Sequence, residues 1–531
     1  MAQILVQDSL QPPPQPAVGP LPVPRPPLSR IPSSPGPGSG SATARTGIVV
    51  FSGGSAANSL VDVFEGVRRA SAATLSYVIP ISDNGGSTSE IIRVFGGPGI
   101  GDVRSRLVRL IPADNKPETA AIKHLLNHRL PPSYDAARAE WFDILEGTHA
   151  LWRDIPSPKR ELVRSFFNSF NLEVVKRMRP TSRFDYSGSS IGNLFLTGAR
   201  LFTGSFEAAI CLLSSICAVP DRVAVLPALN TNFAHHIAAG LVDGTVITGQ
   251  NDISHPSAPT AAVPLPGRSS GTTPGTHTPA LSMGHDLDDD DDDNNNNNEH
   301  EHEHEHEHDD DEVEVEDANL PGSLPALRRP AIAVSKQDEE DLPCRIDRIW
   351  YINPYGQEMR LPANPRVLDA LRGAHTVVYS IGSLFTSLVP GLVLKGVGEA
   401  VASPLIRNKI LLLNGTIDRE TGPSSDPFSG LDFVATIANA CADSRGLPRP
   451  SRAEYALYVT HVIYIEGPTS PVVDRQAFAQ LGIDTTRLYG PKDGQGKGGR
   501  YDAKALEQTL ESIIGRKDTR PDKLRRNTLV G

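Results

Sequence analysis

The sequence predicts an α/β fold, a Rossmann-like three-layer arrangement in which helices cover both faces of a mostly parallel sheet. Short apolar segments of strand length alternate with segments of helical spacing between Thr46 and Asn251 and again after Arg345. Three of the strand candidates lead directly into glycine-rich turns, a pattern typical of phosphate-binding strand–loop–helix units. The alternation is interrupted once, by a long acidic segment that we predict to be a disordered insert.

The first strand and its loop lie near the start of the fold. Gly47–Phe51 is an apolar, β-branched run, and Ser52-Gly53-Gly54-Ser55 turns the chain into the helical segment Ala56–Ala70. Glycines let backbone N–H groups approach an anion closely, and the positive end of the following helix faces that anion. We therefore predict that this turn binds phosphate through Gly53, Gly54 and Ser55.

Two more glycine segments follow. The strand candidate Leu75–Ile81 ends in Ser82-Asp83-Asn84-Gly85-Gly86-Ser87, and Gly96–Asp102 leads into the helix Val103–Leu110. Because the carboxyl ends of parallel strands share one edge of a sheet, we expect these loops to form one pocket. The alternative is three ordinary strand–helix turns, since glycine and Asp are common in turns for local reasons.

Two aspartates and an arginine in these loops suit a magnesium–phosphate centre. Magnesium takes oxygen ligands and usually bridges one or two carboxylates to phosphate oxygens. We predict Asp83 and Asp102 as the Mg²⁺ ligands and, with Arg104, as the catalytic residues. Phosphate contacts are predicted from the same loops, at Asn84, Gly85, Gly86 and Ser87.

The middle of the chain is mostly helical by its spacing. Thr119–Leu130 and Lys159–Arg177 are predicted helices, and the second has an apolar face for the core or a partner at Leu162, Val163, Phe166, Phe167 and Phe170. Ser187–Asn193 opens another helix through Arg200. Its hydroxyls and amides could cap that helix or hold a phosphate, and we predict Gly192 and Asn193 as phosphate contacts. Two further strands are predicted, Arg222–Pro227 and Gly244–Thr248, with Asn230–Leu241 as their connection.

The segment from His255 to Asp341 has a different composition. It contains Asp288–Asp293, Asn294–Asn298 and then alternating Glu and His through His308. With 23 acidic and 4 basic residues its net charge is −19, whereas the whole chain is at −11, which leaves +8 for the remainder. The mildly basic remainder suits a pocket for phosphorylated ligands. The five alternating histidines lack a spacing that fixes a tetrahedral zinc site, so we expect only adventitious metal binding there.

The fold resumes with strands at Arg345–Asn353, His375–Ser380 and Lys409–Asn414, and His461–Ile465 is predicted as the last strand. The loop after His375–Ser380 is another candidate anion loop, and with the end of the next strand it supplies four predicted ligand contacts: Gly382, Ser383, Thr386 and Asn414. Gly490–Gly499 is expected to be a flexible loop before the helix Asp502–Ile514. The basic residues from Arg516 to Arg526 are expected to form a solvated tail rather than a nucleic-acid site.

These segments together resemble the 2-phospho-L-lactate transferase (CofD) superfamily, and within it the YvcK-like branch, the bacterial gluconeogenesis factors. The resemblance runs from about Gly47 to Asp432 without the insert, and the Asn runs and acidic repeats suggest a eukaryotic, fungal version. The motifs that match are Gly53-Gly54-Ser55, Ser82–Ser87, Pro98–Arg104, Ser190–Leu194, Ser380–Ser387 and Leu413–Thr416.

The resemblance implies two kinds of function. CofD-type enzymes move a phospholactyl group from a guanosine-diphosphate-linked donor to a deazaflavin acceptor with magnesium, whereas YvcK-like members resemble UDP-sugar-binding regulators of carbon metabolism and cell-wall synthesis. Glu420-Thr421-Gly422 and Asp432 are similar to the family's Glu-Thr…Asp segment, but Phe433 stands where the family has His, and Asn84 replaces the second Asp of the usual Asp-Asp-Gly-Gly-Ser. A structural scaffold without ligand chemistry is a third possibility.

The composition limits the cellular compartment in which we expect this protein. The four cysteines include no Cys-x-x-Cys pair, which indicates buried, reduced thiols. The sequence pattern predicts neither a secretory signal nor a membrane span. We therefore expect a cytoplasmic protein. The expected partner is a GDP- or UDP-linked small molecule, and a homodimer is compatible with this expectation. We divide the chain into a disordered Pro/Ser-rich segment (1–45), two halves of the α/β domain (46–254 and 344–470), the insert (255–343) and a C-terminal extension with one helix and a basic tail (471–531).

Overall fold

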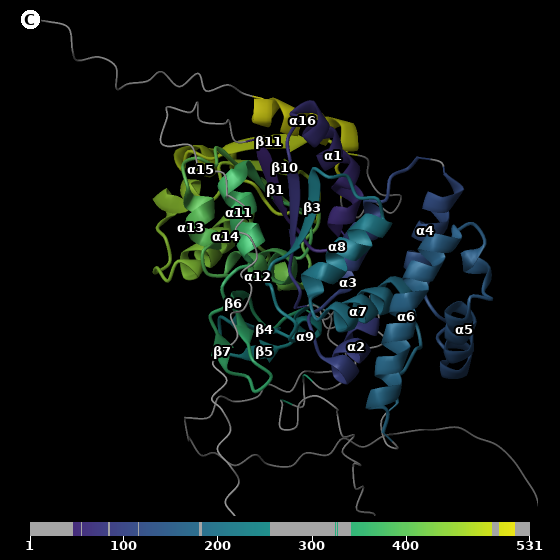
Figure 1. The fold of residues 1–531 in the computed structure, drawn as a ribbon. Helices are drawn as coiled ribbons and strands as arrows, with labels where there is room; N and C mark the ends of the chain where they lie inside the picture. Colours follow the sequence, from purple (N-terminus) through teal and green to yellow (C-terminus); the bar gives the residue numbers. More distant parts are fainter. Residues whose placement is uncertain are drawn as a thin grey trace, which may run out of the picture. The chain divides into compact units, whose positions relative to one another are not determined.

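A parallel seven-stranded sheet forms the centre of the fold in the computed structural model (Figure 1). The structure describes residues 46–54, 56–82, 85–114, 116–179, 183–254, 324, 327, 341–490 and 499–515. The predicted N-terminal disordered segment, most of the predicted insert, most of the 490–499 loop and the basic tail lie outside these residues. The strands, in sheet order, are β11 (Asp484–Leu488), β10 (His461–Ile465), β9 (Asn408–Leu412), β8 (Ala374–Tyr379), β1 (Gly47–Phe51), β2 (Leu75–Ile79) and β3 (Val223–Pro227).

The strand order reverses at β1, and this reversal positions the site. From β1 the chain proceeds to β2 and β3 on one side, and it later returns beside β1 as β8 and continues outward to β11. Phe51 at the end of β1 pairs with Val78 of β2 and Tyr379 of β8, so these strands end at the same level. The predicted Rossmann-like fold with a mostly parallel sheet is confirmed, and its switch point, where ligands of such sheets bind, lies between β1 and β8.

Helices cover both faces of the sheet, as the three-layer prediction requires (Figure 1). Every residue of β1 is buried, which is why its sequence is a continuous apolar run. One face is covered by α11 (Pro365–Gly373), α13 (Val397–Ala402) and α14 (Gly430–Ser444), which pack on one another, and the other by α1 (Val61–Ala70) with α16 (Ala503–Gly515). Other helical elements are η1 (Ala56–Leu60), α2 (Ser87–Phe95), α3 (Gly101–Arg109), η5 (Arg452–Leu457) and α15 (Arg475–Gln480).

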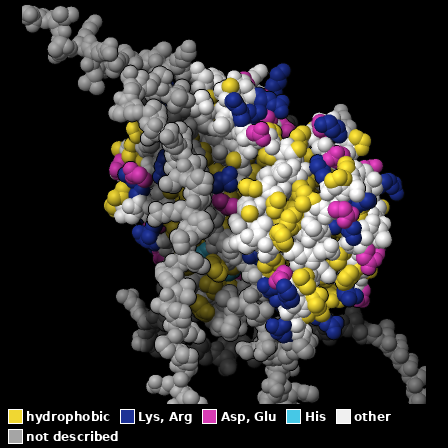
Figure 2. Space-filling view, in the orientation of Figure 1, with side chains coloured by type: hydrophobic (Ala, Val, Ile, Leu, Met, Phe, Trp, Pro, Cys, Tyr) yellow, Lys and Arg dark blue, Asp and Glu magenta, His cyan; other side chains and the backbone are white. Residues whose placement is uncertain are grey.

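A helical layer is formed in the long sequence segment that connects β2 to β3. It consists of α4 (Pro117–Asn127), α5 (Tyr134–Glu146), η2 (Ala150–Trp152), α6 (Ser157–Arg177), α7 (Ile191–Thr203) and α8 (Phe206–Ile216). The predicted apolar face of α6 divides: Val163, Phe166, Phe167 and Phe170 are buried, whereas Leu162 is 42% exposed. Figure 2 shows hydrophobic side chains among the charged ones on the visible surface of this layer.

A second, antiparallel sheet has the order β5 (Val246–Thr248), β4 (His236–Leu241), β6 (Ile346–Ile352) and β7 (Glu358–Met359). The prediction that Asn230–Leu241 is only a connection was wrong, because its second half is strand β4. The predicted strands at Gly244–Thr248 and Arg345–Asn353 exist but belong to this sheet. The helix α9 (Gln250–Ser254) packs against β4 and β5.

The C-terminal part completes the large sheet. β11 follows β10 and pairs with it in parallel. The prediction that His461–Ile465 is the last strand was therefore wrong. All four cysteines are free, but Cys211 is exposed, in contrast to the expected buried thiols. Among the described residues, no helix combines the length and the apolar character needed to cross a bilayer.

Candidate functional site

A buried arginine, Arg106, fixes the loop after β1 through hydrogen bonds. Ser52, Gly53 and Gly54 are all buried. Arg106 of α3 is fully buried and donates to the Gly53 carbonyl at 2.9 Å and the Ser52 hydroxyl at 3.3 Å, while its guanidinium stacks on the Tyr77 ring at 4.5 Å. Burial lowers the pKa of Arg106, because the charged form has lost its water.

Asp102 lies directly against this loop. It occupies the first turn of α3 and accepts a hydrogen bond from the Gly54 backbone N–H. A Cβ on Gly54 would lie 2.1 Å from Asp102 Oδ1 and 3.1 Å from its Cα, so only glycine allows this approach. Burial raises the pKa of Asp102, against the opposing effects of Gly54, Arg106 and Arg104.

Three predicted residues form one hydrogen-bonded chain. Arg104 Nε donates to Asn193 Oδ1 at 3.1 Å, and Asn193 Nδ2 donates to the Ser87 hydroxyl at 3.1 Å. Gly192 permits this contact, since a Cβ there would lie 2.7 Å from Arg104 Cδ. Burial, with a contribution from Arg129, lowers the pKa of Arg104 to about 10. The starts of α2, α3 and α7 are thus linked.

The hydroxyls at the start of α7 do not cap it. Ser190 is the N-cap residue, but its side chain makes no capping hydrogen bond. Ser189 Oγ and Ser190 Oγ are both buried and have no hydrogen-bond partner among the described residues. Of the two predicted uses of these hydroxyls, capping is therefore wrong, and contact with a ligand stays a prediction.

The loop after β8 is tied to the end of β9. Gly382 has a φ of +135°, a conformation that favours glycine, and its N–H donates to Asn414 Oδ1 at 3.0 Å. Asn414 Nδ2 donates back to the Gly382 carbonyl at 2.9 Å. Asn414, predicted as a ligand contact, therefore uses its amide to fix the shape of this loop.

A buried carboxyl group occupies the anion position of the β8 loop. The π-helix η3 (Leu384–Leu388) begins there and continues into α12 (Val389–Leu392). Glu420 of η4 (Arg419–Thr421) accepts from the N–H groups of Phe385 at 2.9 Å and Thr386 at 3.0 Å, and from the Thr386 hydroxyl at 2.6 Å. Thr386, predicted as a phosphate contact, is thus bound to a side chain of the protein itself.

The β1 and β8 loops meet at Ser387. A Cβ on Gly53 would lie 2.4 Å from Ser387 Oγ and 3.4 Å from Asp102 Oδ2. Ser387 in turn lies 3.7 Å from the corresponding position on Gly382. The structure therefore brings Gly53, Gly54, Asp102 and Gly382 together at the switch point, and Ser383 lies at the start of η3 beside them.

Some predicted residues fall outside the described part of the chain, namely Ser55, Asp83 and Asn84. Gly85 and Gly86 are described, and Gly86 has a φ of +56° immediately before α2. Within the described ranges no group of three or more His, Cys, Asp or Glu side chains is arranged to hold a metal ion. A magnesium ion at this edge would therefore depend on one or two carboxylates and on ligand oxygens.

The Glu-Thr…Asp segment is mainly structural in this chain. Asp432 accepts from the Ser429 N–H at 2.8 Å and caps α14, and Arg345 lies 3.4 Å from its other oxygen. Phe433 is buried against Phe428. The loops after β9 and β10 enclose a cavity of about 510 Å³ next to this segment, lined in part by Asp418, Arg419, Phe428 and Thr469.

Sequence reasoning missed Arg106, Ser387 and the role of Glu420. Arg106 lies two positions after Arg104 on the same helix. The sequence therefore contains no sign that Arg106 contacts the glycine loop and that Arg104 contacts α7. Ser387 belongs to the motif Ser380–Ser387, which was identified in the sequence. Its place in the first turns after Gly382 is the signal that could have identified it as a site residue.

Comparisons with known proteins show the family and the fold of this chain. The family model described as 2-phospho-L-lactate transferase CofD matches residues 48–486. The uncharacterised protein YNL011C of Saccharomyces cerevisiae is 38% identical over 431 residues, which cover 79% of this chain and 90% of the yeast protein.

Two crystal structures of protein BH3568 from Bacillus halodurans are similar. One covers 88% of this chain and 99% of that chain, with a TM-score of 0.50 and 16% identity, and shows that the α/β fold is shared. The other, described as a member of the UPF0052 family, covers 87% and 97% with a TM-score of 0.49 and 18% identity.

Proposed function

The chain belongs to the 2-phospho-L-lactate transferase (CofD) family, and on that premise we propose that it is a CofD-like, magnesium-dependent transferase. It would move a phosphorylated group of the 2-phospho-L-lactate type from a nucleotide-diphosphate-linked donor to an acceptor. The donor would bind across the β1 and β8 loops, at the switch point of the sheet.

Two buried arginines that share a single carboxylate, Asp102, carry this proposal. Arg104 and Arg106 are 8% and 0% exposed, and neither forms an ion pair among the described residues. Asp102 is the acidic group whose charge acts on both. Because a buried charge needs compensation, an anionic ligand at the adjoining glycine loops would be favoured. A pyrophosphate is the group that glycine loops of this kind are suited to hold.

The residues present fit a magnesium ion. Asp102 is a partly buried carboxylate beside the glycine loop, and burial raises its pKa. Asp102, together with Asp83, would hold the ion against the ligand phosphates. When bound, magnesium would neutralise charge that develops at the transferring phosphoryl group.

The chain's own groups would supply positioning. The Gly54 N–H holds the Asp102 carboxylate toward the loop, and the Arg104–Asn193–Ser87 chain fixes the starts of three helices. Such fixed donors and charges lower the barrier mainly through orientation and electrostatics.

A YvcK-like regulator that binds a UDP-sugar without turnover is the second candidate. The specific observation in its favour is Phe433, which is 2% exposed and packed against Phe428 at the position where the family has His. A step that needs that imidazole would be lost, whereas binding at the glycine loops would be kept.

A thermal-shift screen tests both candidates. UDP-sugars, GDP, GTP, NAD(P) and flavins are compared with and without magnesium, and a ligand at a hundredfold excess over its Kd should stabilise the protein by about 2.7 kcal/mol. Magnesium-dependent consumption of a nucleotide-linked donor supports the transferase. Stabilisation by a UDP-sugar with no group transfer supports the regulator, and no stabilisation by any nucleotide contradicts both.

A further inference from the structure

A groove lies between the antiparallel sheet and the C-terminal half of α14. It consists of two cavities of about 180 and 280 Å³ that share Val393 and Asp443 as lining residues. The first is lined mainly by β6, β7 and the residues after α12 and α14, and the second by β6, η3, α12 and α14. No residue of the β1 or β2 loops lines either cavity.

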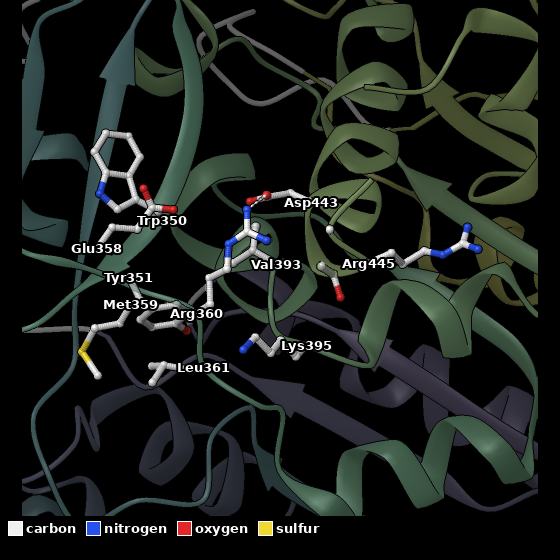
Figure 3. Close-up of a pocket in the computed structure, with 12 residues that line it drawn as sticks. Trp350, Tyr351, Glu358, Met359, Arg360, Leu361, Val393, Lys395, Asp443 and Arg445 are labelled. Carbon is white, nitrogen blue, oxygen red and sulfur yellow. Dashed lines mark hydrogen bonds and ion pairs between the residues drawn. The ribbon is translucent and has the colours of Figure 1, made fainter. Parts of the chain in front are cut away.

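The first cavity contains a cation without an acidic partner. Arg360 pairs with Asp443 at 3.3 Å, and Arg445 pairs with Glu399 at 2.8 Å. Lys395 forms no ion pair within the described part of the chain, and its backbone is fixed by hydrogen bonds to Leu361 and Ala363. Figure 3 shows Arg445 extending away from the side chains of Arg360 and Lys395. Glu358 also lines this cavity, but it pairs with Arg348 at 2.6 Å. Among the described residues, the excess positive charge of the cavity therefore lies at Lys395.

Apolar and aromatic side chains form the rest of the groove. Trp350 and Tyr351 of β6 line the first cavity, and Ile349, Phe385 and Val389 line the second. Tyr351 is anchored by its hydroxyl, which donates to the Pro390 carbonyl at 3.0 Å. A few charged groups set in an apolar, concave surface are typical of small-molecule sites.

We propose that this groove is a second ligand site, for a small organic anion that joins one acidic group to an aromatic or apolar body. The acidic group would meet Lys395. The body would lie beside Trp350, whose ring is covered on one side by the Arg348 guanidinium at 4.4 Å, and toward Val393. The site is built mainly by β6, β7 and α14, and the β8 loop contributes only Phe385, so its ligand need not be the nucleotide-linked donor.

Tryptophan fluorescence with phenyl phosphate as the probe tests the proposal on the full chain. Trp350 lines the groove and is partly buried, whereas Trp141 and Trp152 are 0% and 2% exposed in the core. We expect a saturable change in emission that is absent in Trp350→Phe. Inorganic phosphate and phenol each lack half of the required chemistry and should give no saturable change at the same concentrations.

Two lysine variants test the charge. Lys395→Met keeps the unbranched chain up to the ε position and removes the charged ammonium. It should weaken phenyl phosphate binding about tenfold, the loss expected for one charge-assisted contact. Lys504→Met on α16 removes a similarly exposed lysine outside the groove and should leave binding unchanged. Equal affinity of Lys395→Met and wild type would overturn the proposal.

Hydrogen exchange locates the probe. Binding in the groove should slow exchange at residues 359–361, 393–395 and 443–446. Protection confined to residues 52–54 and 85–87 would mean that phenyl phosphate binds only at the glycine loops, and the proposal would be wrong.

Discussion

Replacing Glu420 should separate its hydrogen-bonding role from its charge. In Glu420→Ala the N–H groups of Phe385 and Thr386 stay buried without an acceptor, since both residues are at most 3% exposed. At about 1–3 kcal/mol for each unsatisfied buried group, this variant should lose about 3–5 kcal/mol of unfolding free energy. Glu420→Gln keeps the shape and one oxygen for both N–H groups, and its amide can donate to the Thr386 hydroxyl. It should lose about 1 kcal/mol or less.

The same pair of variants has a defined pH dependence. Burial, with Asp418 nearby, raises the pKa of Glu420 to about 8 from 4.5, even though three donors oppose the shift. The folded state therefore binds a proton here that the unfolded state releases. The contribution to stability is complete below about pH 4.5 and is lost as the pH rises through about 8. Glu420→Gln cannot titrate, so its stability should lack this component.

Urea unfolding of wild type, Glu420→Gln and Glu420→Ala at about pH 5.5 and about pH 8.5 measures both effects. Other titrating groups cancel when wild type is compared with Glu420→Gln. The wild type should lose stability relative to Glu420→Gln at the higher pH. The reasoning fails if Glu420→Ala is as stable as Glu420→Gln, or if the difference between wild type and Glu420→Gln does not change with pH.

Two further perturbations test the glycine loop and the domain organisation. Gly54→Ala should abolish nucleotide-ligand binding and cost about 1–3 kcal/mol by thermal unfolding, because its Cβ would lie 3.1 Å from Asp102 Cα. Gly373→Ala, where a Cβ meets nothing within 4 Å, is the control, and equal behaviour of the two variants would show that Gly54 tolerates a side chain. Deletion of residues 1–45 and 255–340 should leave a folded, ligand-binding protein, and loss of cooperative unfolding would contradict the proposed domain division.

The large sheet could be predicted because its strands carry local signals. Gly47–Phe51 is buried along its whole length, so its sequence is a continuous apolar run followed by a glycine turn. β4 lacks such a signal: His236–Leu241 contains two alanines and a glycine, and its partner β6 lies beyond the insert. β11, Asp484–Leu488, is a mostly polar strand at the edge of the sheet. Tertiary pairing rather than local propensity determines both strands.

The candidate site could be predicted only as a set of loops. Glycine turns after strands place Gly53, Gly54 and Gly382 at one edge, and the structure confirms that they meet. That Glu420 occupies the β8 loop depends on a contact between residues 34 positions apart. Likewise, the orientation of Arg104 toward Asn193 and of Arg106 toward Gly53 depends on how α3 packs.

Titration calorimetry of GDP and of UDP-sugars is the most direct test of a magnesium–phosphate centre at the β1 and β8 loops. Wild type, Asp83→Asn and Asp102→Asn are compared in magnesium and in EDTA, because Asn keeps the size of Asp and removes only its charge. We predict that one nucleotide-linked ligand binds wild type more tightly in magnesium, and that each variant loses this gain while its affinity in EDTA is unchanged. Equal affinities for all three proteins in both conditions would contradict the role of Asp83 and Asp102 in holding a metal ion.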